Sequence, residues 1–524
     1  MPVAECSRLH RPPDTVRENL RARISAATTT LALAVAFFIP IVGTAAEEAD
    51  RPNIVFVLAD NLGYGDIGCF GSKKHRTPHL DRMAAEGARL TSFYSTAPVC
   101  TPSRASFLTG CYPRRVSLHV DVNGIPVLRA VSSRGLNPDE ITIAEILRQR
   151  GYATACVGKW HLGDQPPFLP RKHGFDEFFG LPYSEDMTEK PATKIAAARG
   201  PLPLVEGETV IEAPVDRNTL TARFTSRAID FIEKNKSRPF FLYLPHTMPG
   251  STLTSFASDD FRGKSNNGTY GDAVEELDWS IGQVLDALKS NGLDEKTLVI
   301  WSSDNGAIWR QSTANENIKA GRDEEHGLGN NRPMVGWAYS TDEGGMRMPF
   351  VARWPGKIPP GTTSDELTTA MDLMPTLAGL AGAKVPTDRV IDGKNIWPLL
   401  TGEADAKSPT EVFFYYFLTQ LQALRSGKWK LYLPLDHKWE KFNGDGAAAE
   451  LRLVDLVIDP QEKNNVAADH PDVVERLLGY AEKARADLGD INRPGSGQRP
   501  AGHYPDPRPM WLSETAEPNG TRPQ

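Results

Sequence analysis

The sequence predicts an α/β fold with a mostly parallel central sheet, followed by a smaller antiparallel sheet with one helix. Over most of the chain, short apolar runs alternate with amphipathic segments, which is the order of parallel strands and crossover helices. The apolar runs are continuous, as in strands that are covered on both faces. Beyond residue 400 the runs become closely spaced, which favours antiparallel hairpins.

The elements of the first part follow in order along the chain. Residues 51–58 are a β-branched apolar run and predict a buried strand. Gly87 and Gly110 close two helical segments, as glycine commonly does. Residues 272–289 place apolar side chains on one helical face. The predicted strands are 51–58, 153–157, 239–244 and 297–301, and the predicted helices are 81–87, 102–108, 141–149, 224–234, 272–289 and 371–381.

The C-terminal part predicts a separate small sheet. Its strands are expected at 411–417, 422–426, 429–433 and 451–456, with a covering helix at 472–487. The last residues are rich in proline, glycine and arginine, which indicates an irregular tail. We therefore expect a signal peptide at 1–46, a large α/β domain at 47–400, a C-terminal α+β subdomain at 401–490 and a tail at 491–524.

The N-terminus has the layout of a signal peptide. Arg17, Arg21 and Arg23 precede an apolar run at 31–42, and small residues follow at 43–46. A membrane anchor is the alternative, but the apolar run is shorter than a bilayer-spanning helix. We expect an exported protein (secreted, periplasmic or lysosomal) with no stable membrane span after removal of the signal.

The overall charge bears on the class of partner. The net charge of −7 argues against a general nucleic-acid binder, which needs a basic surface to displace counterions. It does not argue against a small anionic substrate, because a local basic pocket can lie on an acidic protein.

Two predicted strands end in the same dipeptide. Asp60-Asn61 follows the first strand, and Asp304-Asn305 follows the strand at 297–301. Because the carboxyl ends of parallel strands meet at one edge of a sheet, the four side chains are expected to lie close together. Two carboxylates and two amide oxygens suit Ca²⁺ or Mg²⁺ rather than zinc. Taken alone, each Asp-Asn is also compatible with a turn or a helix cap.

Cys100 lies just before a predicted helix start. The helix dipole at such a position acidifies a thiol, and the same helix end favours an anion. The alternative is a structural cysteine without a chemical role. From spacing alone, both interpretations stay open.

The segment that begins at Cys100 resembles a known signature. Cys-x-Pro-Ser-Arg, followed by Thr109-Gly110, is similar to the signature of the sulfatase family, in which the cysteine is oxidised to formylglycine. The resemblance covers roughly residues 51–490, is closest to the arylsulfatase A type, and implies an alkaline-phosphatase-like α/β sandwich with a smaller C-terminal sheet. Further similar segments include Gly63-Tyr64-Gly65-Asp66, Gly158-Lys159-Trp160-His161-Leu162-Gly163, Ser303-Asp304-Asn305-Gly306 and Glu343-Gly344-Gly345.

The resemblance implies a role for each site residue. Hydrated formylglycine from Cys100 attacks sulfur, His246 protonates the leaving oxygen, and His161 assists release of sulfate. Without the resemblance, Lys159 is typical of an exposed loop and both histidines of structural residues. The implied catalytic residues are Cys100, Arg104, Lys159, His161 and His246; the substrate-binding residues are Ser184, Lys159 and His246; the ligands of Ca²⁺, or of Mg²⁺, are Asp60, Asn61, Cys100, Asp304 and Asn305.

The chain departs from the family pattern at two positions. Asn61 stands where an aspartate is usual, which removes one negative charge from the cation site. Ala338 stands where the family has a lysine that contacts sulfate. Arginines at 310, 332 and 347 are the candidates to replace that lysine.

The resemblance also defines the alternatives. The implied function is hydrolysis of an aryl or carbohydrate sulfate, with a sulfated small molecule or saccharide as substrate and a formylglycine-generating or anaerobic maturation enzyme as partner. A phosphonate or phosphodiester hydrolase of the same superfamily is one alternative, and a catalytically weak protein that binds sulfated glycans is another. A zinc phosphatase is disfavoured because Asn61 and Asn305 are poor zinc ligands.

Overall fold

The computed structural model describes residues 51–188, 200–251, 255–308, 329–435, 450–491 and 493–510. The chain from Pro52 onward forms one compact unit. The predicted signal peptide lies outside the described residues, as do Arg310 and the end of the tail at 511–524. Within the described ranges, no helix has both the length and the apolar character needed to cross a membrane. The signal peptide and the domain boundaries stay predictions.

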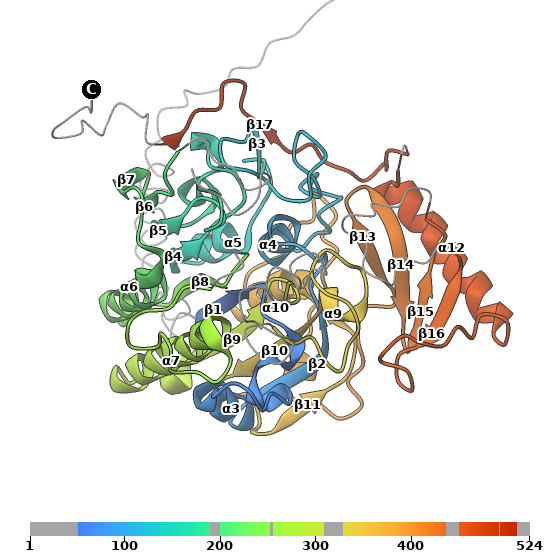
Figure 1. The fold of residues 1–524 in the computed structure, drawn as a ribbon, viewed down its shortest axis with the longest axis horizontal. Coiled ribbons are helices and arrows are strands. Elements are labelled where there is room, and N and C mark those ends of the chain that lie inside the picture. The colour runs from blue at the N-terminus through green and yellow to red at the C-terminus, as the bar shows by residue number, and fades with distance from the viewer. Residues whose placement is uncertain are drawn as a thin grey trace, which may run out of the picture. The chain divides into compact units, whose positions relative to one another are not determined.

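An eleven-stranded sheet forms the centre of this unit (Figure 1). Its five middle strands are parallel, whereas β10 runs antiparallel to both of its neighbours. The mostly parallel sheet is therefore confirmed. In spatial order the strands are β11 (Thr362–Ser364), β2 (Ala88–Tyr94), β10 (Arg347–Arg353), β9 (Thr297–Ser303), β1 (Asn53–Asp60), β8 (Phe240–Pro249), β4 (Ala153–Lys159), β5 (Glu177–Leu181), β6 (Leu204–Glu206) and β7 (Thr209–Glu212), with β12 (Thr368–Thr369) paired to β2.

Helices cover both faces of the sheet, which explains why the middle strands are apolar on both sides. Alternate residues of β1 enter two different cores: Val55 and Val57 face one, and Ile54 and Phe56 face the other. The first core is closed by α3 (Pro78–Ala85), α6 (Leu220–Asn235) and α7 (Gly268–Ser290). The second is closed by α4 (Cys100–Thr109), α5 (Ile143–Gln149) and α10 (Leu373–Leu380), which Figure 1 labels, and by α11 (Trp397–Leu400).

The predicted C-terminal sheet is present. Its strands are β13 (Phe413–Phe417), β14 (Gln420–Ser426), β15 (Trp429–Tyr432) and β16 (Arg452–Asp455), all antiparallel, and α12 (Pro471–Leu488) packs on them. Tyr415 and Lys430 of this sheet reach Glu343 in α9 (Glu343–Met346) with contacts of 2.8 and 3.1 Å. Buried polar contacts thus tie the second sheet to the first part of the chain.

The described part of the tail is irregular but anchored. Its one short strand, β17 (Gly502–His503), pairs with β3 (Arg134–Gly135). Arg499 also forms an ion pair with Glu140 at 2.7 Å. In Figure 1 this segment runs from the end of α12 across to β3.

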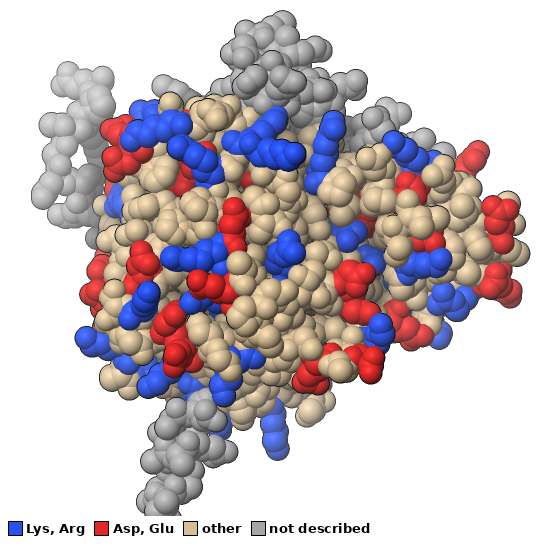
Figure 2. Space-filling model, turned by 90° about the horizontal axis from the view of Figure 1, so that it is seen from below, with Lys and Arg blue, Asp and Glu red and all other residues tan. Residues whose placement is uncertain are grey.

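On the face seen in Figure 2, basic and acidic side chains are interspersed.

The buried ring of His173 gives a prediction for stability. It stacks on Trp160 with a centroid separation of 5.7 Å, and neither ring nitrogen has a hydrogen-bond partner among the described residues. Burial lowers the pKa of His173 to about 3. Below about pH 6.5 the histidine is protonated in the unfolded chain but stays neutral in the folded chain. The free energy of unfolding therefore decreases progressively as the pH falls from about 6.5 toward 3.

His173→Phe is therefore expected to stabilise the protein more at pH 5 than at pH 8, with a difference of about 2 kcal/mol. Urea unfolding at the two pH values measures this difference. His503→Phe, at an exposed position, is the control and is expected to show no such pH dependence. An equal effect of His173→Phe at both pH values would contradict the prediction.

Candidate active site

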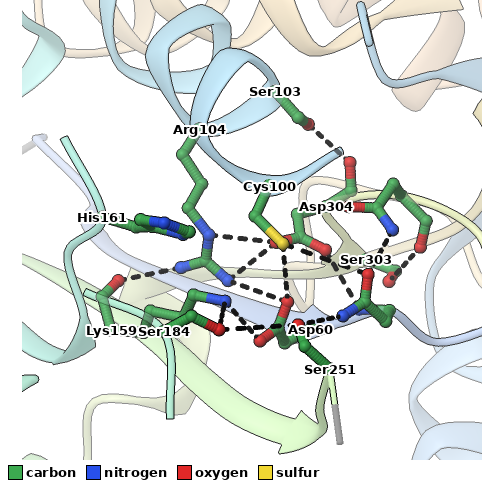
Figure 3. Close-up of polar contacts among 12 residues, drawn as sticks. Asp60, Cys100, Ser103, Arg104, Lys159, His161, Ser184, Ser251, Ser303 and Asp304 are labelled. Atoms are coloured by element: carbon green, nitrogen blue, oxygen red, sulfur yellow. Dashed lines mark hydrogen bonds and ion pairs between the residues drawn. The ribbon is translucent and has the colours of Figure 1, made fainter. Parts of the chain in front are cut away.

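Three elements bring acidic side chains and a thiol to one edge of the central sheet (Figure 3). Ala59 of β1 pairs with Ser303 of β9, so the side chains that follow, Asp60 and Asp304, lie next to each other. Helix α4 begins at Cys100 over this edge. The ligand atoms of Asp60, Cys100 and Asp304 all lie within 4.8 Å of one another, and all three residues are buried. The structure thus brings the two strand ends together with the cysteine.

The two asparagines complete an oxygen-rich set. Asn61 adopts a left-handed conformation (φ 60°), which asparagine tolerates, and its backbone N–H donates to Asp304 Oδ1 at 3.0 Å. The amide of Asn305 donates to Asn61 Oδ1. Asn305 Oδ1 is buried and has no hydrogen-bond partner within the described residues. An orphaned carbonyl oxygen beside two carboxylates fits a hard divalent cation.

The thiol of Cys100 does not behave as the helix dipole alone predicts. Its Sγ lies 3.2 Å from Asp60 Oδ1. Burial, and then the negative charges of Asp304 and Asp60, raise the pKa of Cys100 well above its usual value. The expectation of an acidified thiol is therefore wrong for this arrangement, because burial and then the carboxylates outweigh the helix end.

Arg104 and Lys159 are the two buried cations of the cluster. Arg104 forms an ion pair with Asp304 Oδ2 at 2.8 Å and donates to Lys159 O at 2.8 Å. Lys159 Nζ lies 2.6 Å from Asp60 Oδ2 and 3.0 Å from Ser184 Oγ. Burial alone would lower the pKa of Lys159, but the Asp60 carboxylate outweighs it and the pKa is raised. Both side chains therefore stay positively charged.

Glycine is required beside Lys159. Gly158 has φ +133°, and a Cβ there would meet the carbonyl oxygen of Pro245 at 2.0 Å. The close approach of β4 and β8 at this point fixes where Lys159 leaves the sheet.

His161 lies beside the two cations (Figure 3). Its Nε2 is 2.9 Å from Leu128 O, so this nitrogen carries the proton, and Nδ1 has no partner among the described residues. Burial, and then the charges of Lys159 and Arg104, lower the pKa of His161 well below its usual value. His161 is therefore a neutral imidazole with a free acceptor nitrogen.

The structure does not bring His246 to the cluster. Side chains alternate along β8, and Leu244 and Met248, in phase with His246, face the core under α6 and α7. His246 Nε2 lies 3.1 Å from the hydroxyl of Ser280 in α7. Burial lowers the pKa of His246 to about 3. The side chain of His246 thus contacts α7, and its predicted roles as proton donor and substrate contact stay predictions.

Two residues that sequence reasoning missed contact the cluster. Ser251 Oγ accepts from Asn61 Nδ2 at 2.9 Å. Glu185 accepts from Ser184 Oγ at 2.9 Å and from the backbone N–H of Ser251 at 2.6 Å, and lies 3.9 Å from Lys159 Nζ. Burial raises the pKa of Glu185, against the effect of Lys159. Glu185 directly follows Ser184, which is the one signal in the sequence that pointed to it.

Position 338 lies close to the cluster in the chain fold. The backbone N–H of Ala338 donates to Ala307 O at 3.1 Å, two residues beyond Asn305. Of the arginines considered as replacements for the absent lysine, Arg347 donates to Thr91 O at 2.7 Å and lies 3.7 Å from Glu343. Its guanidinium is therefore occupied by β2 and α9.

Sequence comparison identifies relatives over most of the chain. Residues 52–383 match the sulfatase family, and residues 325–483 match the C-terminal region of N-sulphoglucosamine sulphohydrolase. Human (Homo sapiens) arylsulfatase A is 36% identical and the match covers 88% of this chain and 96% of that protein. Steryl-sulfatase of Rattus norvegicus is 38% identical, covering 67% and 70%. N-acetylgalactosamine-6-sulfatase of Mus musculus is 38% identical, covering 76% and 75%.

Solved structures agree with this assignment. A protein of Bacteroides thetaiotaomicron, described with the metabolism of multiple glycosaminoglycans, has a TM-score of 0.70 at 28% identity, covering 83% of this chain and 99% of that one. A sulfatase from Pseudoalteromonas sp. has a TM-score of 0.70 at 25% identity, covering 84% and 91%. The phosphonate monoester hydrolase of Agrobacterium radiobacter shares the fold, with a TM-score of 0.53 at 22% identity. The chain therefore belongs to the sulfatase family of sulfuric ester hydrolases.

Proposed function

We propose that this sulfatase hydrolyses its sulfate ester with a formylglycine made from Cys100 and with Ca²⁺, or Mg²⁺, held by Asp60, Asn61, Asp304 and Asn305. The observation that carries the proposal is the buried cluster itself. A thiol at a helix start, two carboxylates and an orphaned amide oxygen meet beside two paired cations. A cysteine with a purely structural role would not require charged side chains and an unpaired amide oxygen around it.

The charges of the cluster suit an anionic substrate. Asp60 and Asp304 balance Arg104 and Lys159 in charge. A bound divalent cation would leave the site positive, which favours a sulfate monoester and the charge that develops toward the leaving oxygen. When formed, hydrated formylglycine supplies the hydroxyl that attacks sulfur.

The remaining roles, substrate binding and proton transfer, fall to side chains of the protein. Arg104 and Lys159 bind sulfate oxygens, with Ser184 Oγ, 3.0 Å from Lys159 Nζ, as a further contact. His161 accepts a proton at Nδ1, its free nitrogen. Asp304 orients Arg104 through its ion pair. The proposal assigns no step to His246.

The substrate class and the partners are part of the same proposal. The names of the relatives include a steryl-sulfatase and an N-acetylgalactosamine-6-sulfatase, so a sulfated small molecule or saccharide is the expected substrate. Maturation requires a formylglycine-generating or anaerobic maturation enzyme, and no nucleic-acid partner is expected. The N-terminal pattern supports export to a secreted, periplasmic or lysosomal location.

Mass spectrometry of the tryptic peptide 90–104 tests the formylglycine. Replacement of the thiol by an aldehyde lowers the peptide mass, and the matured fraction is expected to track specific activity between preparations. A panel of the sulfate, phosphate and phosphonate esters of one phenol is measured alongside, with the sulfate expected to react fastest. An active preparation in which the peptide keeps its thiol would contradict the proposal. A preference for phosphonate would favour the related hydrolase activity.

Asn61→Asp is expected to raise the affinity for Ca²⁺ about tenfold, because a third carboxylate joins the oxygen set. The hydroxyl of Ser251 can reverse its hydrogen bond and donate to the new carboxylate. Calorimetric titration with Ca²⁺ measures the change. Asn395→Asp adds the same charge at an exposed position before α11 and is the matched control. No gain in affinity over this control would count against Asn61 as a ligand.

Ala338→Lys is expected to raise kcat/KM for an aryl sulfate severalfold, because a further cation beside Asn305 stabilises the sulfate oxygens. Ala338→Met, of similar length without the charge, separates electrostatics from crowding. Steady-state kinetics of both variants give the comparison. An unchanged rate for the lysine variant would mean that another residue already supplies this charge.

A further inference from the structure

A second basic hollow lies outside the cluster around Cys100. It is formed where the loop after α4, strand β3 and the chain after α12 come together, and its volume is about 460 Å³. Sugar-sized ligands are bound in pockets of this size. Its lining residues are Arg114, Ser117, His119, Val120, Arg134, Asp490, Arg493, Pro494 and Gln498.

Two of its three arginines are only partly compensated, Arg114 by Asp490 and Arg134 by Asp121. Arg114 donates to Leu488 O at 3.1 Å and contacts His119 Nε2 at 2.8 Å, and Arg134 donates to Val120 O at 2.9 Å. The partners of both arginines in these contacts are uncharged groups: two backbone carbonyls and an imidazole. Within the described part of the chain, neither guanidinium forms a salt bridge with a carboxylate. Burial lowers the pKa of both arginines, which is the mark of positive charge held without full compensation.

The one carboxylate in the lining is already occupied. Asp490 pairs with Arg485 at 2.7 Å and accepts the backbone N–H groups of Leu421 and Ile491 at 3.0 and 2.8 Å. The third arginine, Arg493, lies at the rim with about half of its side chain exposed and contacts Glu482 at 3.0 Å. The interior of the hollow is therefore positive.

We propose that this hollow is a second binding site, for an oxyanion group such as sulfate or carboxylate carried on a sugar. Guanidinium groups match the geometry of such oxyanions. A bound anion relieves the cost of the buried charge of Arg114 and the half-buried charge of Arg134, neither of which forms a salt bridge within the described residues. Ser117 and Gln498 offer neutral polar groups for sugar hydroxyls. The site uses none of the residues assigned to the reaction and stands whether or not Cys100 is matured.

Calorimetric titration of the full chain with galactose 6-sulfate tests the proposal. Two binding events are expected, one at the cluster of Cys100 and one at the hollow. Arg134→Gln and Arg493→Gln are each expected to weaken one event about tenfold and to leave the other unchanged. Arg508→Gln, which removes an exposed charge paired with Asp506, is the matched control and is expected to change neither. Thermal unfolding of each variant shows that it is folded.

Two further ligands define the chemistry. Unsulfated galactose is expected not to produce the second event, and inorganic sulfate is expected to produce it more weakly than the sugar sulfate. Equal affinity for inorganic sulfate would overturn the sugar part of the proposal. A crystal soaked in selenate is expected to show an anomalous peak between Arg114 and Arg134. Absence of that peak together with unchanged titrations of both arginine variants would overturn the site itself.

Discussion

Asp304→Asn is expected to abolish measurable Ca²⁺ binding and to lower kcat/KM for an aryl sulfate by about 1,000-fold or more. The side chain of Asp304 contacts several members of the cluster at once. Its Oδ2 holds Arg104 with an ion pair of 2.8 Å, and its Oδ1 accepts the backbone N–H of Asn61 at 3.0 Å. It also belongs to the group of ligand atoms with Asp60 and Cys100. The amide keeps the shape of the side chain but removes the charge.

The same substitution is expected to lower stability. Arg104 is fully buried, and its other carboxylate neighbour, Asp60, lies at 3.7 Å and already binds Lys159. Breaking one member of a buried ion pair costs about 3–5 kcal/mol, because the remaining charge stays desolvated. Unfolding in urea measures this loss, and calorimetry with Ca²⁺ measures the loss of the site.

Asp372→Asn is the matched control for this prediction. Asp372 is equally buried but lies outside the cluster, where it accepts the backbone N–H groups of Thr369 and Lys394, both at 2.7 Å. Burial raises the pKa of Asp372 to about 7, so the neutral amide is a smaller change there. Full cation affinity in Asp304→Asn would show that the cation is held elsewhere.

The middle of the fold could be predicted because its signals are local. The runs that became β1, β8 and β9 are apolar on both faces. The predicted ends of β1 and β9 lie within about two residues of the observed ones, whereas β8 continues to Pro249, beyond its predicted end at residue 244. β2 and β10 were missed. β2 carries arginine, threonine and serine among its apolar residues, and its pairing with β10 joins segments more than 250 residues apart. That pairing is a tertiary effect that no local pattern reveals.

In the candidate site, too, the features that depend on local sequence could be predicted, and those that depend on tertiary contacts could not. Asp60 and Asp304 could be placed together because they follow neighbouring parallel strands. The contacts of His246 could not be predicted from its sequence neighbourhood. Its hydrogen-bond partner, Ser280, lies on α7, 34 residues further along the chain. Likewise the helix start at Cys100 is visible in the sequence. The burial that raises the pKa of Cys100, and the two carboxylates that add to it, depend on other elements of the fold.

Gly250→Ala is expected to lower kcat/KM about 10- to 100-fold, although residue 250 carries no functional group. Gly250 has φ +91°, and its N–H donates to Asp60 O at 3.0 Å. A Cβ there would lie 2.7 Å from Glu185 Oε1 and 2.9 Å from Thr247 O. The carboxyl group of Glu185 thus occupies the space that a side chain at 250 would need.

Displacing Glu185 disturbs the substrate-binding side of the cluster. Glu185 accepts from Ser184 Oγ and from the N–H of Ser251, so both would lose a partner, and Lys159 with its contact to Ser184 would shift. The backbone strain at 250 adds a stability cost of about 1–3 kcal/mol, because alanine disfavours this φ. Loss of activity and loss of stability are therefore expected together, but from different causes.

A double-mutant cycle separates the two causes. Glu185→Ala removes the clash with the carboxylate but leaves both the backbone strain and the contact with Thr247 O. Adding Gly250→Ala to Glu185→Ala is therefore expected to cost as much stability as in the wild type but much less activity. Kinetics with an aryl sulfate and urea unfolding of the four proteins give both coupling energies. If the activity losses of the two single variants simply add, Glu185 and residue 250 do not share this space, and the role of Gly250 is confined to its backbone.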